Sequence, residues 1–306
     1  FKRFSKSTPS GRTNSISLMD DIKDKFSNER QEPAPRVLYV VGTPIGNLGD
    51  LSPRAKSVLS KVSTIACEDT RRTGKFLKSL GLQQTLLSFH QHNTKSRIPK
   101  LIELLREGKS LAIVSDAGLP GISDPGEELI NQAKKMGYGV ICIPGPCAAI
   151  TALISSGLPT KRFSFEGFLP FKSKERKKTL ELIAKETKTT VIYESPYKLI
   201  TLLRELASIC GEDRPMTVAR ELTKYHEETI GHNIGAVLQH FLKHKPKGEC
   251  TVVLGGAIEV NQKHTSLDLL KEMQVLISNG ASYNEAAKTI AQKTGTSKRY
   301  LYSLLH

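Results

Sequence analysis

The sequence predicts an α/β protein of two α/β domains followed by a small helical extension, and three observations support this fold class. From Val37 onward, short apolar runs alternate with amphipathic stretches of helix length. Three segments rich in Gly and Pro, 42–50, 115–126 and 143–149, each follow an apolar run and precede a helix-like stretch. The last 41 residues contain only helix-like stretches. Because loops at the carboxyl ends of strands in an open α/β sheet share one edge, we expect the Gly- and Pro-rich segments to converge on a small molecule.

Residues 1–36 differ in composition from the rest of the chain. Up to Leu18 this segment holds four basic residues, many Ser and Thr, and no acid, which is typical of an organelle transit segment. A disordered extension with Pro33-Ala-Pro35 as a linker has the same composition. We expect a cytoplasmic protein under the second interpretation and a plastid or mitochondrial protein under the first.

Residues 37–157 are expected to form an N-terminal α/β domain. The alternation of β-like and helix-like stretches predicts a sheet rich in parallel strands. The expected strands are Val37–Val41, Val62–Cys67, Leu86–Phe89, Leu111–Ser115 and Val140–Ile143, and the expected helices are Pro53–Ser60, Thr70–Leu80, Thr94–Glu107, Gly126–Met136 and Cys147–Ser156. Ser52-Pro53 and Asp124-Pro125 are predicted helix starts, with a polar cap and Pro in the first turn.

Residues 158–256 are expected to form a C-terminal α/β domain with a mixed sheet. Its expected strands are Phe163–Phe168, Thr189–Tyr193, Met216–Arg220, Lys224–Ile230 and Glu249–Leu254, and its expected helices are Lys174–Lys185, Pro196–Ile209 and Ile234–Leu242. Residues 257–265 are interpreted as a linker. The tail, 266–306, is expected to form helices at Ser266–Ser278, Ser282–Lys293 and Thr296–Leu305, the last two joined by a short turn of the helix-turn-helix kind.

Composition narrows the partners and the compartment. The chain has 45 Lys and Arg against 30 Asp and Glu, a formal net charge of +15, which favours a polyanionic partner such as nucleic acid. No apolar run approaches the roughly 18–20 residues of a membrane span, so no membrane partner is expected. The five cysteines lack Cys-x-x-Cys spacing and indicate buried thiols in a reducing compartment. His90 and His92 lie near no Cys or acid cluster of metal-ligand spacing, so no metal is expected.

The first Gly-rich loop matches neither of two common phosphate-binding motifs. Gly42, Gly46 and Gly49 follow a predicted strand, but no Gly-Lys-Ser/Thr sequence ends the loop, and the spacing does not match the dinucleotide fingerprint. The loop therefore predicts a ligand that needs close approach of the backbone and no lysine.

Nine sequence blocks follow one another from about Val37 to Gly256: VGTPIGNLGDLS, ACEDTRRTGKFL, SFHQHN, SDAGLPGISDPG, IPGPCAAITAL, FEGFLPFK, YESPYKL, VARELTKYHEE and KGECTVVLGG. In this order they resemble the bacterial 16S rRNA (cytidine-2′-O-)-methyltransferase family, a branch of the tetrapyrrole (precorrin) methylase-like superfamily. The resemblance implies S-adenosyl-L-methionine in a cleft between two α/β domains and a homodimer. It also implies methyl transfer to the ribose 2′-hydroxyl of a cytidine in the decoding centre of the small ribosomal subunit.

The same resemblance implies a set of cofactor-binding residues. They are Pro44, Asp116, Gly118, Leu119, Pro120, Gly121, Ile122, Cys147, Ala148, Tyr193, Ala219 and Arg220. Most members of the family carry Ser or Thr in place of Cys147, and Thr is more frequent than Leu119. Backbone contacts are expected to tolerate both changes. On chemical grounds Asp116, at a strand end, is the acid expected near the sulfonium, with capping of its own loop as the alternative.

A ribose hydroxyl is weakly acidic, so a base or a nearby cation is expected to help the methyl transfer. Four carboxylates at predicted strand ends are candidates: Glu68, Asp69, Glu194 and Glu221. The sequence does not choose among them, because Glu68 and Asp69 stand next to Arg71-Arg72, and Glu221 follows Arg220. Such neighbours favour structural ion pairs equally well.

Two basic groups are candidates for contact with RNA. Lys172, Lys174, Arg176, Lys177 and Lys178 follow the aromatic segment 168–171 and can bind phosphates beside stacked bases. Lys298 and Arg299 open the last helix, where a helix-turn-helix motif places its contacts. A solvated helix face is the alternative for the first group, and packing on the body or pairing of subunits is the alternative for the tail.

These observations predict an S-adenosyl-L-methionine-dependent methyltransferase that modifies a cytidine 2′-hydroxyl of small-subunit rRNA. Methylation of a tetrapyrrole carbon is the first alternative, although a porphyrinoid substrate does not require the positive charge. A non-catalytic RNA-binding assembly factor that keeps the cofactor pocket is the second.

Overall fold

The computed structural model describes residues 32–257, 266–294 and 296–304. Most of the N-terminal extension, predicted to be a targeting or disordered segment, and of the proposed linker lies outside these residues. Residues 32–184 and 188–255 form one compact unit, and the tail forms a second unit together with residues 185–187.

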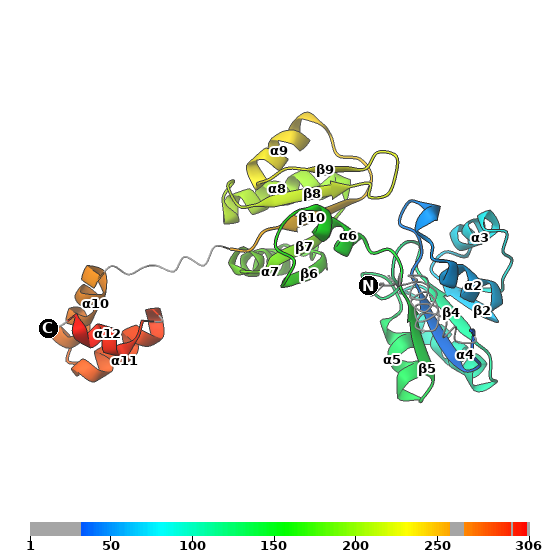
Figure 1. Cartoon of the computed structure of the whole chain (residues 1–306), viewed down its shortest axis with the longest axis horizontal. Helices are drawn as coiled ribbons and strands as arrows, with labels where there is room; N and C mark the ends of the chain where they lie inside the picture. Colours follow the sequence, from blue (N-terminus) through cyan, green and yellow to red (C-terminus); the bar gives the residue numbers. More distant parts are fainter. Residues whose placement is uncertain (1–31, 258–265, 295, 305–306) are drawn as a thin grey trace, which may run out of the picture. The chain divides into compact units, whose positions relative to one another are not determined.

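The first sheet has five parallel strands in the order β3-β2-β4-β1-β5 (Figure 1). They are β1 (Val37–Val41), β2 (Thr64–Cys67), β3 (Leu86–Ser88), β4 (Leu111–Val114) and β5 (Gly139–Ile143). The helical elements between them are η1 (Leu48–Asp50), α2 (Pro53–Lys61), α3 (Thr70–Ser79), α4 (Thr94–Arg106) and α5 (Glu127–Lys135).

Alternation along β1 shows how this sheet is covered. Tyr39 and Val41 pack with buried residues of α2 and α3, whereas Leu38 and Val40 pack with buried residues of α4 and α5. Successive side chains of a strand point to opposite faces, so helices cover both sides of the sheet. The carboxyl ends of the strands therefore remain free to carry loops.

The second sheet is mixed, with the order β6-β7-β10-β8-β9 (Figure 1). Its strands are β6 (Phe163–Phe168), β7 (Thr189–Glu194), β8 (Met216–Arg220), β9 (Glu228–Ile230) and β10 (Cys250–Leu254). β6 and β7 are parallel, and the other pairs are antiparallel.

The two faces of the second sheet pack differently. One face packs on α7 (Ser173–Lys185), α8 (Pro196–Cys210) and α9 (Ile234–Lys243). The other face packs on α6 (Ala148–Ser155) and on Ile45 of the loop after β1. The first loop of one sheet therefore contributes to the hydrophobic core of the other.

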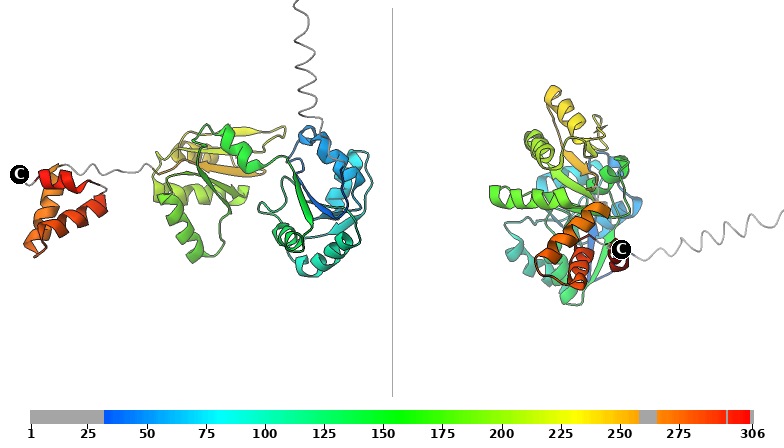
Figure 2. Two further views of the ribbon diagram at one scale, coloured as in Figure 1. Left: turned by 60° about the horizontal axis from the view of Figure 1, so that its bottom comes forward. Right: turned by 90° about the vertical axis from the view of Figure 1, so that its left-hand side faces the viewer.

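The tail consists of α10 (Ser266–Ser278), α11 (Tyr283–Thr294) and α12 (Lys298–Ser303), which pack against one another (Figure 2). Leu269, Met273 and Leu301 are buried in its own small core. Ser282 and Glu285 cap α11 reciprocally, since the Glu285 carboxylate accepts from the Ser282 backbone N at 2.9 Å and the Glu285 N donates to the Ser282 hydroxyl at 3.3 Å.

Most expected elements match the observed elements within two residues, but two expectations were wrong. Asp124-Pro125 does not start α5, because the helix begins at Glu127 and its N-cap, Gly126, makes no side-chain capping bond. The strand expected from Lys224 begins only at Glu228, because Glu221 and Thr223 have left-handed backbone and the chain turns there. No helix in the described part of the chain has the length and hydrophobicity to span a bilayer.

Candidate active site

Three loops meet at the carboxyl edge of the first sheet. In the loops after β1 and β4, the Thr43 N donates to the Gly118 O at 2.9 Å, and the Gly118 N donates to the Thr43 O at 3.1 Å. The loops after β1 and β5 touch directly, because a Cβ built on Gly42 lies 2.7 Å from the Gly145 Cα. Glycine is required at both positions, since any side chain would overlap the facing backbone.

The three loops form part of the wall of a cavity of about 340 Å³. The second sheet supplies the rest of the wall, from the ends of β6, β7, β8 and β10. The lining residues are Ile45, Ala117, Gly118, Leu119, Ile122, Ser123, Asp124, Cys147, Ala148, Phe168, Tyr193, Glu194, Ser195, Pro196, Ala219, Leu222, Glu249, Cys250 and Thr251. This size is within the range of cavities that hold small ligands.

The charge of this wall is one-sided. Among the described residues that line the cavity, three are acidic (Asp124, Glu194 and Glu249) and none is Lys, Arg or His. Glu249 is also 3.1 Å from the Lys224 Nζ. A cavity of this composition favours a neutral or cationic ligand with apolar parts over a phosphate.

Tyr193 joins the second sheet to α6 inside the cavity. Its hydroxyl accepts a hydrogen bond from the Ala149 N at 3.0 Å, in the first turn of the helix. Its ring packs edge-on against Phe165, with 5.0 Å between the ring centroids. Burial raises the pKa of Tyr193, so the phenol stays protonated at neutral pH.

Asp124 is the carboxylate with the most perturbed environment in the cavity wall. Burial, and then the negative charge of Glu68, raises the pKa of Asp124 to about 6, although a hydrogen bond from Ser115 opposes the shift. A carboxylate of this kind can exchange a proton near neutral pH. Sequence reasoning missed Asp124 as a site residue, because the Asp-Pro pair predicts a helix start at this position.

Asp116 lies outside the cavity lining. Its carboxylate oxygen Oδ2 is 2.9 Å from Arg72 Nη1, an ion pair between the loop after β4 and α3. Neighbouring Glu68 also stays outside the lining, and burial together with the charge of Asp116 raises the pKa of Glu68. Of the two acids in this loop, Asp124 and not Asp116 is therefore among the described residues that line the cavity.

The other three candidate bases make structural contacts. Asp69 caps α3 through the Arg71 N at 2.8 Å, and the same arginine lowers the pKa of Asp69. Burial opposes the shift at Glu221, but hydrogen bonds from Lys224 and from the backbone N of Glu249 lower the pKa of Glu221.

Glu194 lines the cavity, but its side chain is only 6% exposed and its Oε2 lies 3.6 Å from the Arg176 Nη2. It therefore also makes a structural ion pair.

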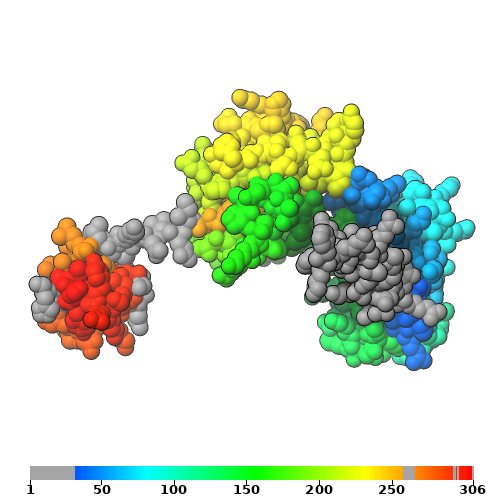
Figure 3. All heavy atoms as spheres, in the orientation of Figure 1, coloured from blue at the N-terminus to red at the C-terminus, as the bar shows by residue number. Residues whose placement is uncertain are grey.

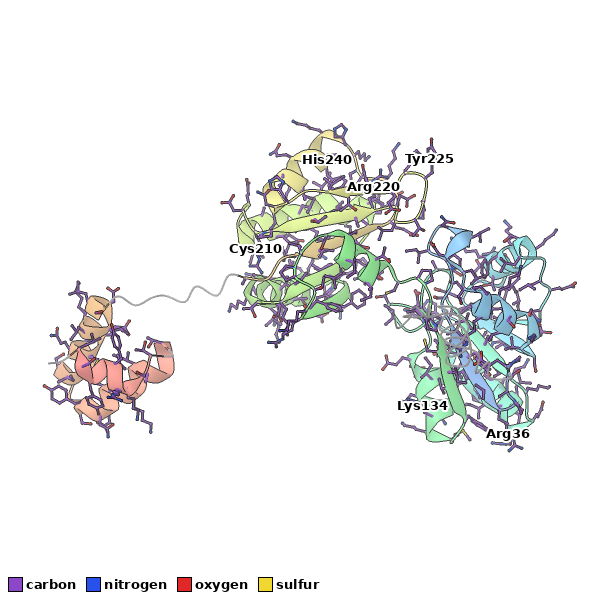
Figure 4. All side chains as sticks on the ribbon, viewed as in Figure 1. Arg36, Lys134, Cys210, Arg220, Tyr225 and His240 are labelled. Carbon is purple, nitrogen blue, oxygen red and sulfur yellow. The ribbon has the colours of Figure 1, made fainter. Side chains whose placement is uncertain are left out.

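Arg220 is the last residue of β8, and Tyr225 lies in the loop that follows (Figure 4). The Arg220 side chain is ion-paired with Glu228 and donates a hydrogen bond to the Lys247 O at 3.0 Å. Both contacts hold neighbouring segments of the second sheet together.

The structure thus divides the predicted site residues into two groups. Those in the cavity wall are Gly118, Leu119, Ile122, Cys147, Ala148, Tyr193, Ala219 and Glu194. Those outside the lining are Pro44, Asp116, Pro120, Gly121, Arg220, Glu68, Asp69 and Glu221. Besides Asp124, sequence reasoning missed Phe168 and Thr251, which line the cavity because β6 ends and β10 begins beside it.

The basic residues after β6 also fall into two groups. Four lysines are exposed at or near the start of α7: Lys172, Lys174, Lys177 and Lys178. The Lys172 Nζ lies 3.8 Å from the Glu175 Oε1. Arg176 instead turns inward, with its side chain 14% exposed, and forms a bidentate pair with Glu205. In the tail, Lys298 and Arg299 are exposed in the first turn of α12.

No group of three or more His, Cys, Asp or Glu side chains placed to hold a metal ion occurs within the described ranges. The polar groups of the cavity wall are carboxylates, hydroxyls, the thiols of Cys147 and Cys250, and backbone groups, on an otherwise apolar wall.

Comparisons with known proteins agree on one family. A family model described as Tetrapyrrole (Corrin/Porphyrin) Methylases matches residues 37–237. Ribosomal RNA small subunit methyltransferase I of Synechocystis sp. is 43% identical over 269 residues, which cover 88% of this chain and 96% of that protein. The protein of the same name from Thermotoga maritima is 46% identical over 219 residues, covering 72% of this chain and 98% of that protein.

A solved structure shows the same fold. Uroporphyrin-III-C-methyltransferase from Thermus thermophilus matches with a TM-score of 0.51 at 19% sequence identity, covering 72% of this chain and 94% of that chain. At this level of identity the likeness concerns the fold alone.

Proposed function

This chain belongs to the tetrapyrrole (corrin/porphyrin) methylase family, and we propose that it is an S-adenosyl-L-methionine-dependent methyltransferase of small-subunit ribosomal RNA. The observation that carries the proposal is the acidic and apolar cavity at the carboxyl edge of the first sheet. The names of its relatives supply the substrate class, because they are called ribosomal RNA small subunit methyltransferase I.

The residues of the cavity suit this cofactor. The backbone of Gly118 and Leu119 and the apolar side chains of Ile45 and Ile122 form surfaces for an uncharged ring and an aliphatic chain. Asp124 supplies negative charge for a cationic sulfonium, and no basic side chain in the described lining opposes it. When bound there, S-adenosyl-L-methionine supplies an electrophilic methyl group.

We assign the acceptor to the 2′-hydroxyl of a cytidine ribose in the decoding region. A ribose hydroxyl must lose its proton as the new bond to carbon forms, so the site needs a base close to the acceptor. Asp124 is the proposed base, since it lines the cavity and its pKa is about 6. Besides burial, the negative charges of Glu68 and Asp116 raise the pKa of Asp124, which favours uptake of a proton by the Asp124 carboxylate.

We further propose that the protein acts as a homodimer. Ile150 and Ile154, four residues apart on α6, are 45% and 65% exposed. Residues at this spacing lie on one face of a helix. Figure 3 shows the green segment that includes α6 at the surface. An exposed apolar helix face of this kind is typical of a subunit interface.

The experiment that tests the function combines purified small ribosomal subunits, the protein and methyl-labelled cofactor. Nuclease digestion and mass mapping are expected to locate one labelled 2′-O-methylcytidine in the decoding region. Label on a base or absence of label would refute the assignment. A visible absorption band on the purified protein would instead indicate a tetrapyrrole substrate.

A further inference from the structure

A second concavity, of about 830 Å³, lies between α7 and α8 on the second sheet. The residues that give it its character are basic or aromatic: Phe171, Arg176, Lys177, Lys198 and Arg204, with Glu205 as the one acid in the described lining. We refer to it as the α7–α8 groove.

The groove carries uncompensated positive charge. The Glu205 carboxylate is already neutralised by Arg176, whose Nη2 lies 2.8 Å away. Lys177, Lys198 and Arg204 are exposed, and none of them is ion-paired within the part of the chain that the structure describes. Three cations that are not neutralised by an acid in the described structure favour a ligand with several negative charges.

An exposed aromatic ring lines this groove. Phe171 is 83% exposed, and the Lys198 Nζ lies 3.5 Å from the centroid of its ring. The lysine contact orients one face of the ring, because a cation is attracted to the π-system. Exposed aromatic rings beside cations are the elements with which proteins bind single-stranded nucleic acids, through stacking and phosphate contacts.

The groove adjoins the cavity across two short segments. Phe168, the last residue of β6, lines the cavity, and Phe171, three residues later, lines the groove. At the start of α8, Pro196 lines the cavity and Lys198 lines the groove. A polymer with one unit in the cavity therefore has its neighbouring units within reach of the groove.

We propose that the α7–α8 groove holds the single-stranded RNA next to the target nucleotide. In this arrangement Lys177, Lys198 and Arg204 bind phosphates, and a base stacks on Phe171. The inference rests on the proposed function, because it assumes that the unit in the cavity belongs to an RNA substrate.

The experiment measures the binding of a fluorescent oligocytidylate to the full chain at several salt concentrations. Loss of three phosphate contacts in Lys177→Gln/Lys198→Gln/Arg204→Gln is expected to reduce the slope of log K against log salt by about 2. Phe171→Leu is expected to weaken binding by roughly tenfold at an unchanged slope. The matched control, Lys56→Gln/Lys134→Gln/Lys135→Gln, removes three exposed lysines of the first sheet's helices (Figure 4 labels Lys134) and is expected to keep the slope.

Three results would overturn the inference. These are an unchanged slope in the groove variant, an equal loss in the control variant, and equal competition by double-stranded RNA. Unchanged affinity of Phe171→Leu would refute the stacking contact. The cofactor affinity of the groove variant, measured by calorimetry, should equal that of the wild type. One further result separates the two proposals: the wild type transfers no methyl group, while the groove variant still shows the reduced salt slope. That result would refute the proposed function and leave RNA binding in place.

Discussion

At the residue scale, two acids of one loop have different environments although they stand in similar sequence. Asp116 lies two residues after the end of β4 and pairs with Arg72, whereas Asp124 lies in the wall of the cavity. The charge of Arg72 keeps Asp116 in a conventional ion pair. Asp124 has no such partner in the described structure and is half-buried, which is the reason for its raised pKa.

The role of Asp124 predicts a pH profile. Asp124→Asn is expected to lower kcat by a factor of about 10² to 10⁴, because the amide cannot accept the proton. The wild-type kcat/KM for RNA should fall as the pH drops through about 6, since only the ionised carboxylate acts as a base. The measurement is initial methyl-transfer rate between pH 5 and 9, with Asp213→Asn, an exposed acid, as the control.

The same variant separates catalysis from cofactor binding. If Asp124 only attracts the sulfonium, its replacement will weaken cofactor affinity in calorimetry and leave kcat unchanged, and the assignment as base fails.

The melting temperature of the same variant gives an independent readout of the raised pKa. The folded-state pKa of about 6 lies above the usual value of 3.8, so ionisation of Asp124 destabilises the fold as the pH rises through this window. Asp124→Asn should therefore melt higher than the wild type at pH 8, and this advantage should vanish near pH 4.

Sequence patterns could place these loops but could not rank their acids. Turn residues and the apolar runs before them predicted three loops at one sheet edge, and the structure confirms this. Which acid faces the cavity depends on the path of the loop, where Gly118 and Gly121 take positive φ of +80° and +85°. It also depends on Arg72 from another element. Neither can be read from local spacing.

Gly145 predicts a steric requirement at the same edge. In Gly145→Ala the new Cβ would lie 2.7 Å from the Gly42 Cα, and backbone on both sides prevents relief. We expect a loss of about 1–3 kcal/mol in stability and weaker cofactor binding. Thermal melts and calorimetry check this. Gly74→Ala is the control, because Gly74 is inside α3 with its nearest neighbour at 3.7 Å and should gain about 0.5–1 kcal/mol. Equal melting of both variants would contradict the prediction.

At the scale of elements, α6 links the loop after β5 to the second sheet. Its N-cap, Cys147, makes no side-chain capping bond, and the Tyr193 hydroxyl from β7 accepts from the Ala149 N instead. The sequence predicted α6 from its apolar run, and the structure confirms it. The cap could not be predicted, because its acceptor lies 44 residues away in another sheet.

This contact predicts the effect of Tyr193→Phe. Removal of the hydroxyl leaves the buried Ala149 N–H without its acceptor, which should cost about 1–3 kcal/mol. The free energy of unfolding in urea measures the loss. Tyr138→Phe is the matched control, since no hydrogen bond of that hydroxyl occurs in the described structure. A cost at Tyr193 no larger than at Tyr138 would show that the hydroxyl does not stabilise α6.

The outer face of α6 predicts the subunit interface. Ile154→Glu should place a charge in an apolar contact and convert the dimer to monomer, as measured by sedimentation or light scattering. Leu182→Glu on α7 changes a similarly exposed residue, 62% against 65% for Ile154, and should remain dimeric. A dimeric Ile154→Glu variant would place the interface elsewhere.

For the molecule as a whole, the tail forms a compact unit of its own. It has its own core and its own capping box. The periodicity of its helices predicted the tail as a unit, but periodicity carries no information on what the tail binds.

Removal of residues 258–306 is therefore expected to leave cofactor affinity and the main thermal transition unchanged, because the cavity lies entirely within residues 45–251. Methyl transfer to small subunits should keep its kcat and show a higher KM, since Lys298 and Arg299 leave with the tail. Lys298→Gln/Arg299→Gln in the full chain should reproduce the higher KM at an unchanged melting temperature. If the truncated protein loses cofactor binding, the tail completes the cavity. If the double variant keeps the wild-type KM, the tail contributes by another route than phosphate contact.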